Sequence, residues 1–492
     1  MKVSWRHPLT WTVVLALAVP VLWLGALFLV ATYFAITGRI ELAAVEEKLS
    51  ARGEKLQMAE LAPPPIPDEE NFFADPFWTA RADKDDHPRP FADITEDEAA
   101  ELKRRFPALA DRIEAGGRFA KVRLILPEPG EKPPTPDELA LVIDLLEPAG
   151  PVLGEISRAA QRPKARYPID YSRGIATQLP HVSDLLSIGQ MLSLRARANL
   201  ASGRPEAALA DTLLIFRLAR SVESEPLLIS LLVRISLDGI AMAVVENALP
   251  AWDASQTRQL EEALPRGDQH LAMALRGERG FANAVVSTVR NQGGTGFADF
   301  VQMASFTDQP RQHSPWLKLA LAAYGYAFLP GEMAFLYQLY QEWIDEVSAG
   351  GGIPKPGEIS TADALKEAAG SQPFGRVRYL LPRLILPALE GAFPRVAHWQ
   401  NRVVQARTAC AIQQFALARR RLPTALDELV PDFLESVPTD PMDGNPLRYR
   451  ADGGTYRLWS IGWNEVDENG EVEDRRKPKE GDWIWRGRTP AL

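Results

Sequence analysis

The feature that most constrains this chain is an uncharged apolar run near its N-terminus. No charged residue occurs between Arg6 and Arg39, and residues 9–36 are almost entirely apolar. About 20 such residues cross the hydrocarbon core of a bilayer, so the run is long enough to span it with some tilt. The alternative, a cleaved signal peptide, has an apolar core of only about 7–15 residues. We therefore predict a retained transmembrane anchor that contacts the lipid bilayer through residues 9–36.

The charges on either side of this run predict its orientation. Lys2 and Arg6 precede the run, whereas Glu41, Glu46 and Glu47 follow it. Positive charge favours the cytoplasmic side, so the N-terminus is expected in the cytoplasm and the rest of the chain outside. The predicted location is the inner (cytoplasmic) membrane, with the bulk of the chain periplasmic.

A second apolar stretch covers residues 317–341. Lys318 and Glu332 leave 13 uncharged residues between them, with Pro330 and Gly331 among these residues. This interval is too short to span a bilayer. We predict a buried helix of a soluble domain here, and hence a single-pass protein.

Net charge and cysteine content exclude several classes of protein. The formal charge is −9, and because Lys2 and Arg6 contribute +2, the chain beyond the first apolar run carries −11. A nucleic-acid-binding protein would present a basic face, so nucleic acid is not an expected partner. The single cysteine, Cys410, excludes an intrachain disulfide and a cysteine-rich zinc module. It lies on an apolar helical stretch and is predicted to be a core residue rather than a nucleophile.

Composition divides the chain into four predicted regions. They are a cytoplasmic stub and anchor (1–39), a helix followed by an acidic, proline-rich linker (40–94), a helical body (95–400) and a small α+β module (401–492). The linker is expected to be extended and partly disordered. It contains four aromatic residues that are expected to dock on the protein's own body or, as the alternative, on a partner: Phe72, Phe73, Phe77 and Trp78.

The predicted fold class is mainly α, an irregular helical bundle. Residues 182–202 and 206–222 predict two helices joined by a turn at Gly203, Arg204 and Pro205. Small residues oppose each other across this turn in a spacing that resembles a tetratricopeptide (TPR) hairpin: Ala196, Ala198 and Ala201 against Ala207, Ala208 and Ala210. No 34-residue period repeats the pattern, so a true solenoid is not expected. Residues 226–249 are apolar on nearly every face and predict the buried central helix.

The C-terminal region predicts a helix followed by a hairpin. Residues 401–419 are helical in pattern, and strands at 447–450 and 455–461 flank the turn Asp452-Gly453-Gly454. The turn DPMDGNPL (440–447) and the strand end WSIG (459–462) resemble the major pseudopilin of type II secretion, over residues 403–487. The whole chain, including RPKARYPIDYSRG and GERGF (277–281), also resembles a family of uncharacterised bacterial envelope proteins with one anchor, a helical body and this tail.

The pseudopilin resemblance implies a structural calcium loop after the hairpin. In that family carboxylates and carbonyl oxygens of this loop bind Ca²⁺, and the matching positions here are Asp467, Glu468, Asn469 and Asp482. Further oxygen donors nearby are Asn464, Glu471, Glu473 and Asp474. The alternative is a solvated acidic turn neutralised by Arg475, Arg476, Lys477 and Lys479. The pseudopilin cleavage motif is missing beside the anchor, so we do not expect filament assembly through it.

The sequence predicts no catalytic residue and no cofactor other than calcium. It contains no G-x-S-x-G, Walker, Rossmann or H-E-x-x-H motif. The expected role is a non-catalytic interaction or scaffold component of the cell envelope, linked to secretion, with envelope or secretion proteins as partners. One alternative is a membrane-tethered hydrolase with a carboxylate site in the helical body. A third reading is an orphan pseudopilin-like component of a secretion filament.

Two groups of residues bear on the hydrolase alternative. The first is the charged cluster of Glu278 and Arg279 with Arg276 and Arg290. Paired carboxylates would permit acid–base chemistry, whereas structural ion pairs are the alternative for such a cluster. The second group, Tyr167, Asp170 and Tyr171, either lines a pocket or staples a loop.

Overall fold

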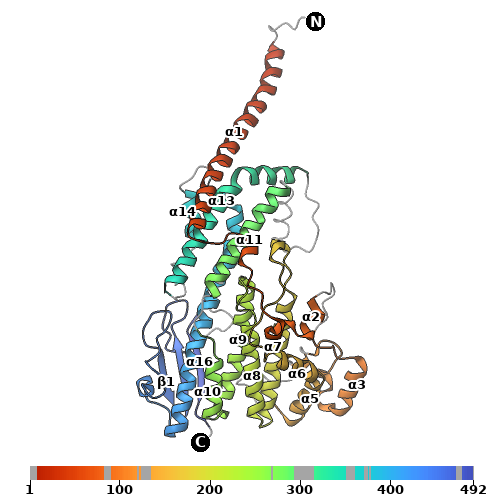
Figure 1. The fold of residues 1–492 in the computed structure, drawn as a ribbon, viewed down its shortest axis with the longest axis vertical. Coiled ribbons are helices and arrows are strands. Elements are labelled where there is room, and N and C mark those ends of the chain that lie inside the picture. The colour runs from red at the N-terminus through yellow and green to blue at the C-terminus, as the bar shows by residue number, and fades with distance from the viewer. Residues whose placement is uncertain are drawn as a thin grey trace.

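Helices form most of the chain, and a small antiparallel sheet lies near its C-terminus (Figure 1). The computed structural model describes residues 8–82, 90–118, 121–122, 134–266, 270–292, 315–350, 361–370, 375, 378–471 and 479–490. The α-helices are α1 (Pro8–Ala51), α2 (Pro76–Ala82), α3 (Glu96–Arg105), α5 (Pro136–Leu146), α6 (Gly150–Ala159), α7 (Pro180–Ala201), α8 (Pro205–Arg220), α9 (Leu228–Ala248), α10 (Ala254–Ala263), α11 (His270–Gln292), α13 (Pro315–Gly350), α14 (Thr361–Gly370), α15 (Leu380–Glu390) and α16 (Phe393–Arg419). The 3₁₀ turns are η1 (Met58–Leu61), η2 (Asp68–Glu70), η3 (Phe72–Ala74), η4 (Pro107–Arg112), η5 (Glu147–Ala149), η6 (Tyr171–Ala176), η7 (Leu249–Ala251) and η8 (Leu426–Leu429).

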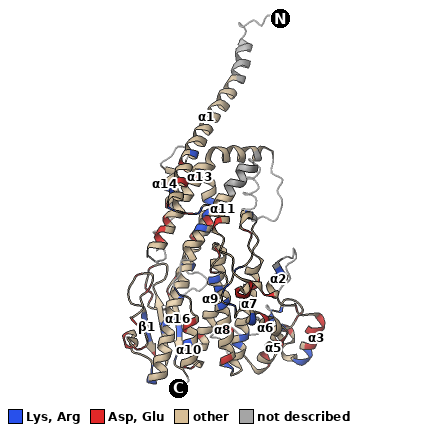
Figure 2. Cartoon of the chain, viewed as in Figure 1, with Lys and Arg blue, Asp and Glu red and all other residues tan. Residues whose placement is uncertain are grey.

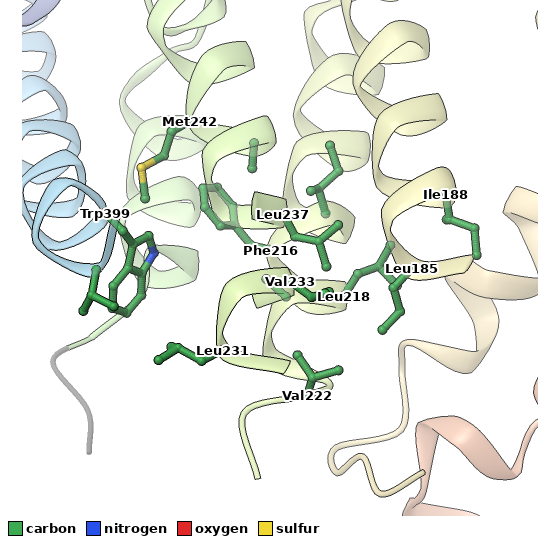
Figure 3. Packing of buried hydrophobic residues seen from close by; sticks show 14 of the residues in the cluster. Leu185, Ile188, Phe216, Leu218, Val222, Leu231, Val233, Leu237, Met242 and Trp399 are labelled. Atoms are coloured by element: carbon green, nitrogen blue, oxygen red, sulfur yellow. The ribbon is translucent and has the colours of Figure 1, made fainter. Parts of the chain in front are cut away.

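The core of the body is built around α9. Helices α7, α8, α11 and α16 pack on it, and Figure 3 shows Leu237 and Met242 of α9 among buried side chains of its neighbours. The approach of α7 to α9 is close, because a Cβ added to Gly189 would lie 2.4 Å from the Leu237 side chain. The expectation of a buried central helix at 226–249 is thus confirmed.

The α7–α8 pair forms the predicted hairpin, with Gly203 at φ +71° in the turn. Of the six small residues, Ala196, Ala198 and Ala208 are buried, while the other three lie at or near the surface. Arg195 of α7 holds Asp211 of α8 through contacts of 2.5–3.2 Å. The likeness to a tetratricopeptide hairpin itself stays a prediction.

The aromatic residues of the linker dock on the protein's own body, as the sequence favoured. Phe72, Phe73, Phe77 and Trp78 are all buried. The Phe73 ring lies 5.2 Å from Tyr167 and 5.5 Å from His181, measured between centroids. The described part of the linker therefore differs from the extended chain we expected: it consists of short 3₁₀ turns and α2, because its aromatic side chains gain burial against the body.

The C-terminal sheet has the strand order β1 (Arg448–Asp452), β2 (Thr455–Ser460) and β3 (Trp483–Arg488), all antiparallel. The two strands predicted from the sequence are thereby confirmed. Helix α16 packs across β2 and β3, and Gln405 donates to the carbonyl of Trp483 at 2.6 Å. The expected boundary at residue 400 falls inside α16, so the body and the module share this helix. Cys410 is fully buried in α16, as predicted for a core residue.

Three helices among the described residues are long and apolar enough to cross a membrane: Ala18–Ala51, Leu228–Ala251 and Pro315–Ala349. Their surroundings differ. The N-terminal part of α1 projects beyond the rest of the molecule, whereas α9 lies inside the body (Figure 1). The third, α13, runs for 36 residues, so Lys318 and Glu332 lie within one continuous helix rather than at its limits. The expected burial of 317–341 holds for Met333 and Tyr340, but it is wrong for Leu319 and Tyr326, which are exposed.

Candidate functional site

One end of the molecule is formed by the free part of α1, a helix long and apolar enough to cross a membrane. The large apolar side chains from Val19 to Leu29 are 47–72% exposed. Buried positions begin at Phe34 and recur at helical spacing through Leu42, Val45 and Leu49. Residues 8–30 of α1 have a length of about 35 Å, which matches the hydrocarbon thickness of a bilayer. The helix therefore presents an apolar rod of membrane length and, beyond it, a stripe that packs on the body.

α1 meets α13 at a crossing of two glycines. A Cβ added to Gly38 would lie 2.7 Å from the backbone nitrogen of Gly331, so the two backbones can approach only without side chains there. The rings of Phe34 and Phe328 lie 5.3 Å apart at this crossing. The Arg39 guanidinium lies 5.2 Å from the centre of the Tyr326 ring. These contacts fix where α1 leaves the body.

A buried ion network anchors α11 to the chain that follows α1. Glu54 accepts from Arg279 at 2.6 Å and from Arg276 at 3.1 Å, and Arg279 also donates to Gln341 of α13. Arg279 is fully buried. Burial opposes ionisation of Glu54, but the hydrogen bonds and charges of the two arginines hold its pKa below the ordinary value of 4.5. The network joins α11, α13 and the residues that follow α1, and it is called the clamp below.

The GERG sequence (277–280) thus has a packing role. A Cβ added to Gly277 would lie 1.6 Å from the carbonyl oxygen of Pro226, so a side chain there would clash with the backbone. Glu278 accepts a hydrogen bond from the backbone N–H of Leu228, and burial raises its pKa to about 7. The structure brings Arg276 and Arg279 together on Glu54 instead of pairing them with Glu278. The side chain of Arg290 lies outside the described residues.

A cleft of about 960 Å³ opens beside this clamp. Its walls come from the end of α1 and η1, from η6 and from α11, and they include Glu54, Tyr171 and Arg173. Tyr167 and Asp170, the other two members of the predicted pocket group, do not line it. Tyr167 stacks on His181 at 3.9 Å, and Asp170 accepts from the backbone of Ser172 at 3.0 Å. Of the three residues, Tyr171 therefore lines the cleft, whereas Asp170 stabilises its own loop.

The body also contains a buried polar cluster that the sequence did not reveal. The carboxylate of Glu225 lies 2.9 Å from His181 Nε2 and accepts from Ser230, while its backbone carbonyl lies 3.1 Å from His270 Nε2. All four residues are at most 2% exposed. In a catalytic triad the histidine contacts the hydroxyl directly, but here the carboxylate separates them. This cluster is enclosed in the core, and no short sequence spacing predicts it.

Three carboxylates that bind Arg448 organise the turn and loop of the C-terminal module. Asp440, fully buried, accepts from the backbone N–H groups of Met442 and Ile461, from the Ser460 hydroxyl and from Arg448 at 2.9 Å. Arg448 also binds Asp443 at 2.7 Å and Asp467 at 2.8 Å. The DPMDGNP turn is therefore fixed to the end of β2 by charge-assisted hydrogen bonds.

The structure places the four predicted calcium ligands in two groups. Asp482 is buried, accepts from Gly470 N–H at 2.7 Å and lies beside the side chain of Glu468. Burial and this neighbour raise the pKa of Asp482 to about 6. Asp467 turns away to Arg448 and Trp459, and Asn469 is exposed.

The calcium assignment is thus not decided by these positions. Within the ranges that the structure describes, no group of three or more His, Cys, Asp or Glu residues can hold a metal ion. Glu473 and Asp474, with Arg475, Arg476 and Lys477, lie outside those ranges. Calcium binding by this loop stays a prediction, and Arg448 is the neutralising residue that the sequence did not reveal.

Comparisons with protein-family models, with curated proteins and with solved structures find no match to this chain. The resemblance to pseudopilins, and to envelope proteins with one anchor, therefore rests on the sequence motifs alone. The structure shows a mainly helical protein with a projecting apolar N-terminal helix, a cleft beside the clamp and a small three-stranded module.

Proposed function

We propose that this protein is a membrane-anchored, non-catalytic interaction component of the cell envelope. Of the described helices α1 alone spans the membrane in this proposal, the N-terminus is cytoplasmic, and the helical body and C-terminal module lie on the exterior side of the inner membrane. The observation that carries this proposal is the free part of α1, because an apolar rod of about bilayer length that stands clear of the body is too costly to leave in water.

The candidate reactive groups of the body support a non-catalytic role. Arg276, Arg279 and Glu54 are engaged with one another, and the Glu225 cluster is enclosed in the core. The proposed binding surfaces are the cleft beside the clamp and the hairpin of the C-terminal module. Envelope or secretion proteins would bind there. A pseudopilin-like role for the module rests on the 440–462 motifs and is part of this proposal.

Site-specific photo-crosslinking in living cells tests the interaction role. A photoreactive amino acid is placed at Arg173 in the cleft and at Asp452 in the hairpin of the full chain, with exposed Glu101 of α3 as the matched control. We expect a discrete protein adduct from the cleft or the hairpin and none from Glu101. Absence of any protein adduct from both positions would contradict the proposal.

The hydrolase alternative is favoured by one observation, the volume of the cleft with the carboxylate of Glu54 in its wall. In that case the ion pairs of Glu54 with Arg276 and Arg279 would have to break before its carboxylate could act on a substrate. Turnover of a cell-envelope substrate by the purified chain, lost in Glu54→Gln while the fold persists, would establish the alternative over the scaffold.

A further inference from the structure

The first half of α13 carries an apolar face that the described chain leaves largely exposed, with Arg39 of α1 over the ring of Tyr326 at its end. The exposed residues of this segment include Trp316 (79%), Leu319 (60%), Ala323 and Tyr326 (45%). These four follow each other at intervals of three, four and three residues, so they form one stripe along the helix, and Leu317 (44%) and Ala320 are exposed beside it. From Pro315 to Gly331 the sequence contains no acidic residue. This stripe is defined below as the α13 face.

The opposite side of the same segment is already engaged. Leu321 and Tyr324 pack against the body's core, and the Phe328 ring contacts Tyr324 at 5.1 Å and Phe34 at 5.3 Å. The segment is therefore held in place by one side and exposes apolar residues on the other. Contiguous exposed apolar surface of this kind marks an interaction site.

The position of the segment indicates what covers it. In Figure 1 the first half of α13 lies across the molecule at the level where α1 projects from the body, and beyond Pro330 the helix turns to run alongside α1. The crossing at Gly38 and Gly331 and the Arg39–Tyr326 contact place it at the end of the free apolar rod. Figure 2 colours the described residues of this segment as uncharged, and its one charged residue, Lys318, has a side chain outside the described residues.

From this arrangement we propose that the first half of α13 is an interfacial helix that lies in the plane of the bilayer and inserts Trp316, Leu319, Ala323 and Tyr326 among the lipid headgroups and upper acyl chains. Trp and Tyr are enriched at this depth, since one part of each ring is apolar and one part polar. The face is continuous with the proposed anchor, so the inference rests on the membrane anchoring by α1. Together the two elements would fix the tilt of the body relative to the membrane.

Depth-dependent fluorescence quenching of the full chain in phosphatidylcholine vesicles tests this inference. An environment-sensitive dye is attached to Leu319→Cys or Ala323→Cys on the α13 face, to Leu27→Cys in the anchor, or to Asp452→Cys in the distant hairpin. The native Cys410 is fully buried, and unsubstituted protein measures any labelling of it. The lipids carry a nitroxide quencher either near the headgroup or near the chain end.

We expect Leu319→Cys and Ala323→Cys to lose fluorescence mainly to the shallow quencher, Leu27→Cys mainly to the deep one, and Asp452→Cys to neither. Quenching of Leu27→Cys without quenching of either α13 position would overturn the interfacial helix and keep the anchor; a second protein copy would then be the covering partner. Stronger deep than shallow quenching at Leu319→Cys would show a membrane-spanning α13 and also overturn the inference. If Leu27→Cys is not quenched, the proposed anchor itself fails.

Discussion

Helices α9 and α13 have similar apolar sequences but opposite surroundings. Both are long and apolar enough to cross a membrane, yet α9 is enclosed by four other helices. It even carries a buried carboxyl group there, since Asp238 is 1% exposed and accepts from Trp399 Nε1 at 2.9 Å. In α13 the buried positions are concentrated from Ala327 onward, while Trp316 and Leu319 face outward. High hydropathy therefore predicts that a helix is removed from water. Whether other protein segments or lipid surround it depends on its tertiary packing.

The largest expected contrast is between truncations on the two helices. Leu237→Ala in α9 removes a fully buried side chain and should lower the free energy of unfolding by about 2–5 kcal/mol. Leu319→Ala on the α13 face should change it by less than about 0.5 kcal/mol in detergent, because that side chain contacts solvent or detergent rather than core. Chemical unfolding of the full chain measures both. Equal losses would show that the α13 face is packed in the protein.

The clamp that holds the enclosed half of α13 should be sensitive to pH. Glu54→Gln keeps the shape but removes the charge that pairs with Arg276 and Arg279, with an expected loss of about 1.5–3 kcal/mol near neutral pH. The folded-state pKa of Glu54 is lowered, so its contribution is present above the ordinary value of 4.5 and is lost as pH falls through the folded pKa. The difference between wild type and Glu54→Gln should therefore shrink in acid. A difference that grows on acidification would contradict the clamp.

The two parts of α1 can be compared by one substitution at two glycines. Gly38→Val places side-chain atoms against the backbone of Gly331 and should lower the free energy of unfolding by about 1–3 kcal/mol. Gly25→Val is the matched control, because no atom lies within 4 Å of an added Cβ there. Thermal unfolding in detergent should separate the two variants. An unchanged Gly38→Val would mean that α1 and α13 do not cross closely.

The smallest expected effect concerns the C-terminal loop without calcium. The pKa of Asp482 is raised from 3.8 to about 6, so its stabilising contribution is present below 3.8 and is lost as pH rises through about 6. Asp482→Asn should therefore gain stability relative to wild type over that range, within about 1 kcal/mol. At neutral pH, calcium should raise the melting temperature of wild type but not of Asp482→Asn. No calcium effect on wild type would favour the acidic turn neutralised by arginine.

The parts of this fold that the sequence predicts are those set by local pattern. Residues 9–36, the central helix at 226–249 and the hairpin around Asp452 follow from composition and periodicity within one segment. The parts it does not predict depend on pairs distant in sequence. Glu54 meets Arg279 across 225 residues, and Glu225 meets His181 across 44, and no spacing rule reports such contacts.

The two partial errors share a physical cause. The proline and charge of the linker predict an extended, partly disordered chain, but Phe73 and Trp78 gain enough burial on the body to order its described part. The stretch 317–341 is predicted as a buried helix because Lys318 and Glu332 divide it, yet the helix continues past both residues and its first part is exposed. In each case tertiary contacts or their absence, rather than local composition, decide the outcome.

The most direct test of the account is the topology of the full chain in cells. Single cysteines are placed at Ser4, before the anchor, and at Asp452 in the exposed hairpin, and are exposed to a membrane-impermeant thiol reagent while the inner membrane is intact. We predict labelling of Asp452→Cys before lysis and of Ser4→Cys only after lysis. Labelling of Ser4→Cys with protection of Asp452→Cys, or the same accessibility at both positions, would contradict an exterior body held by a single anchor.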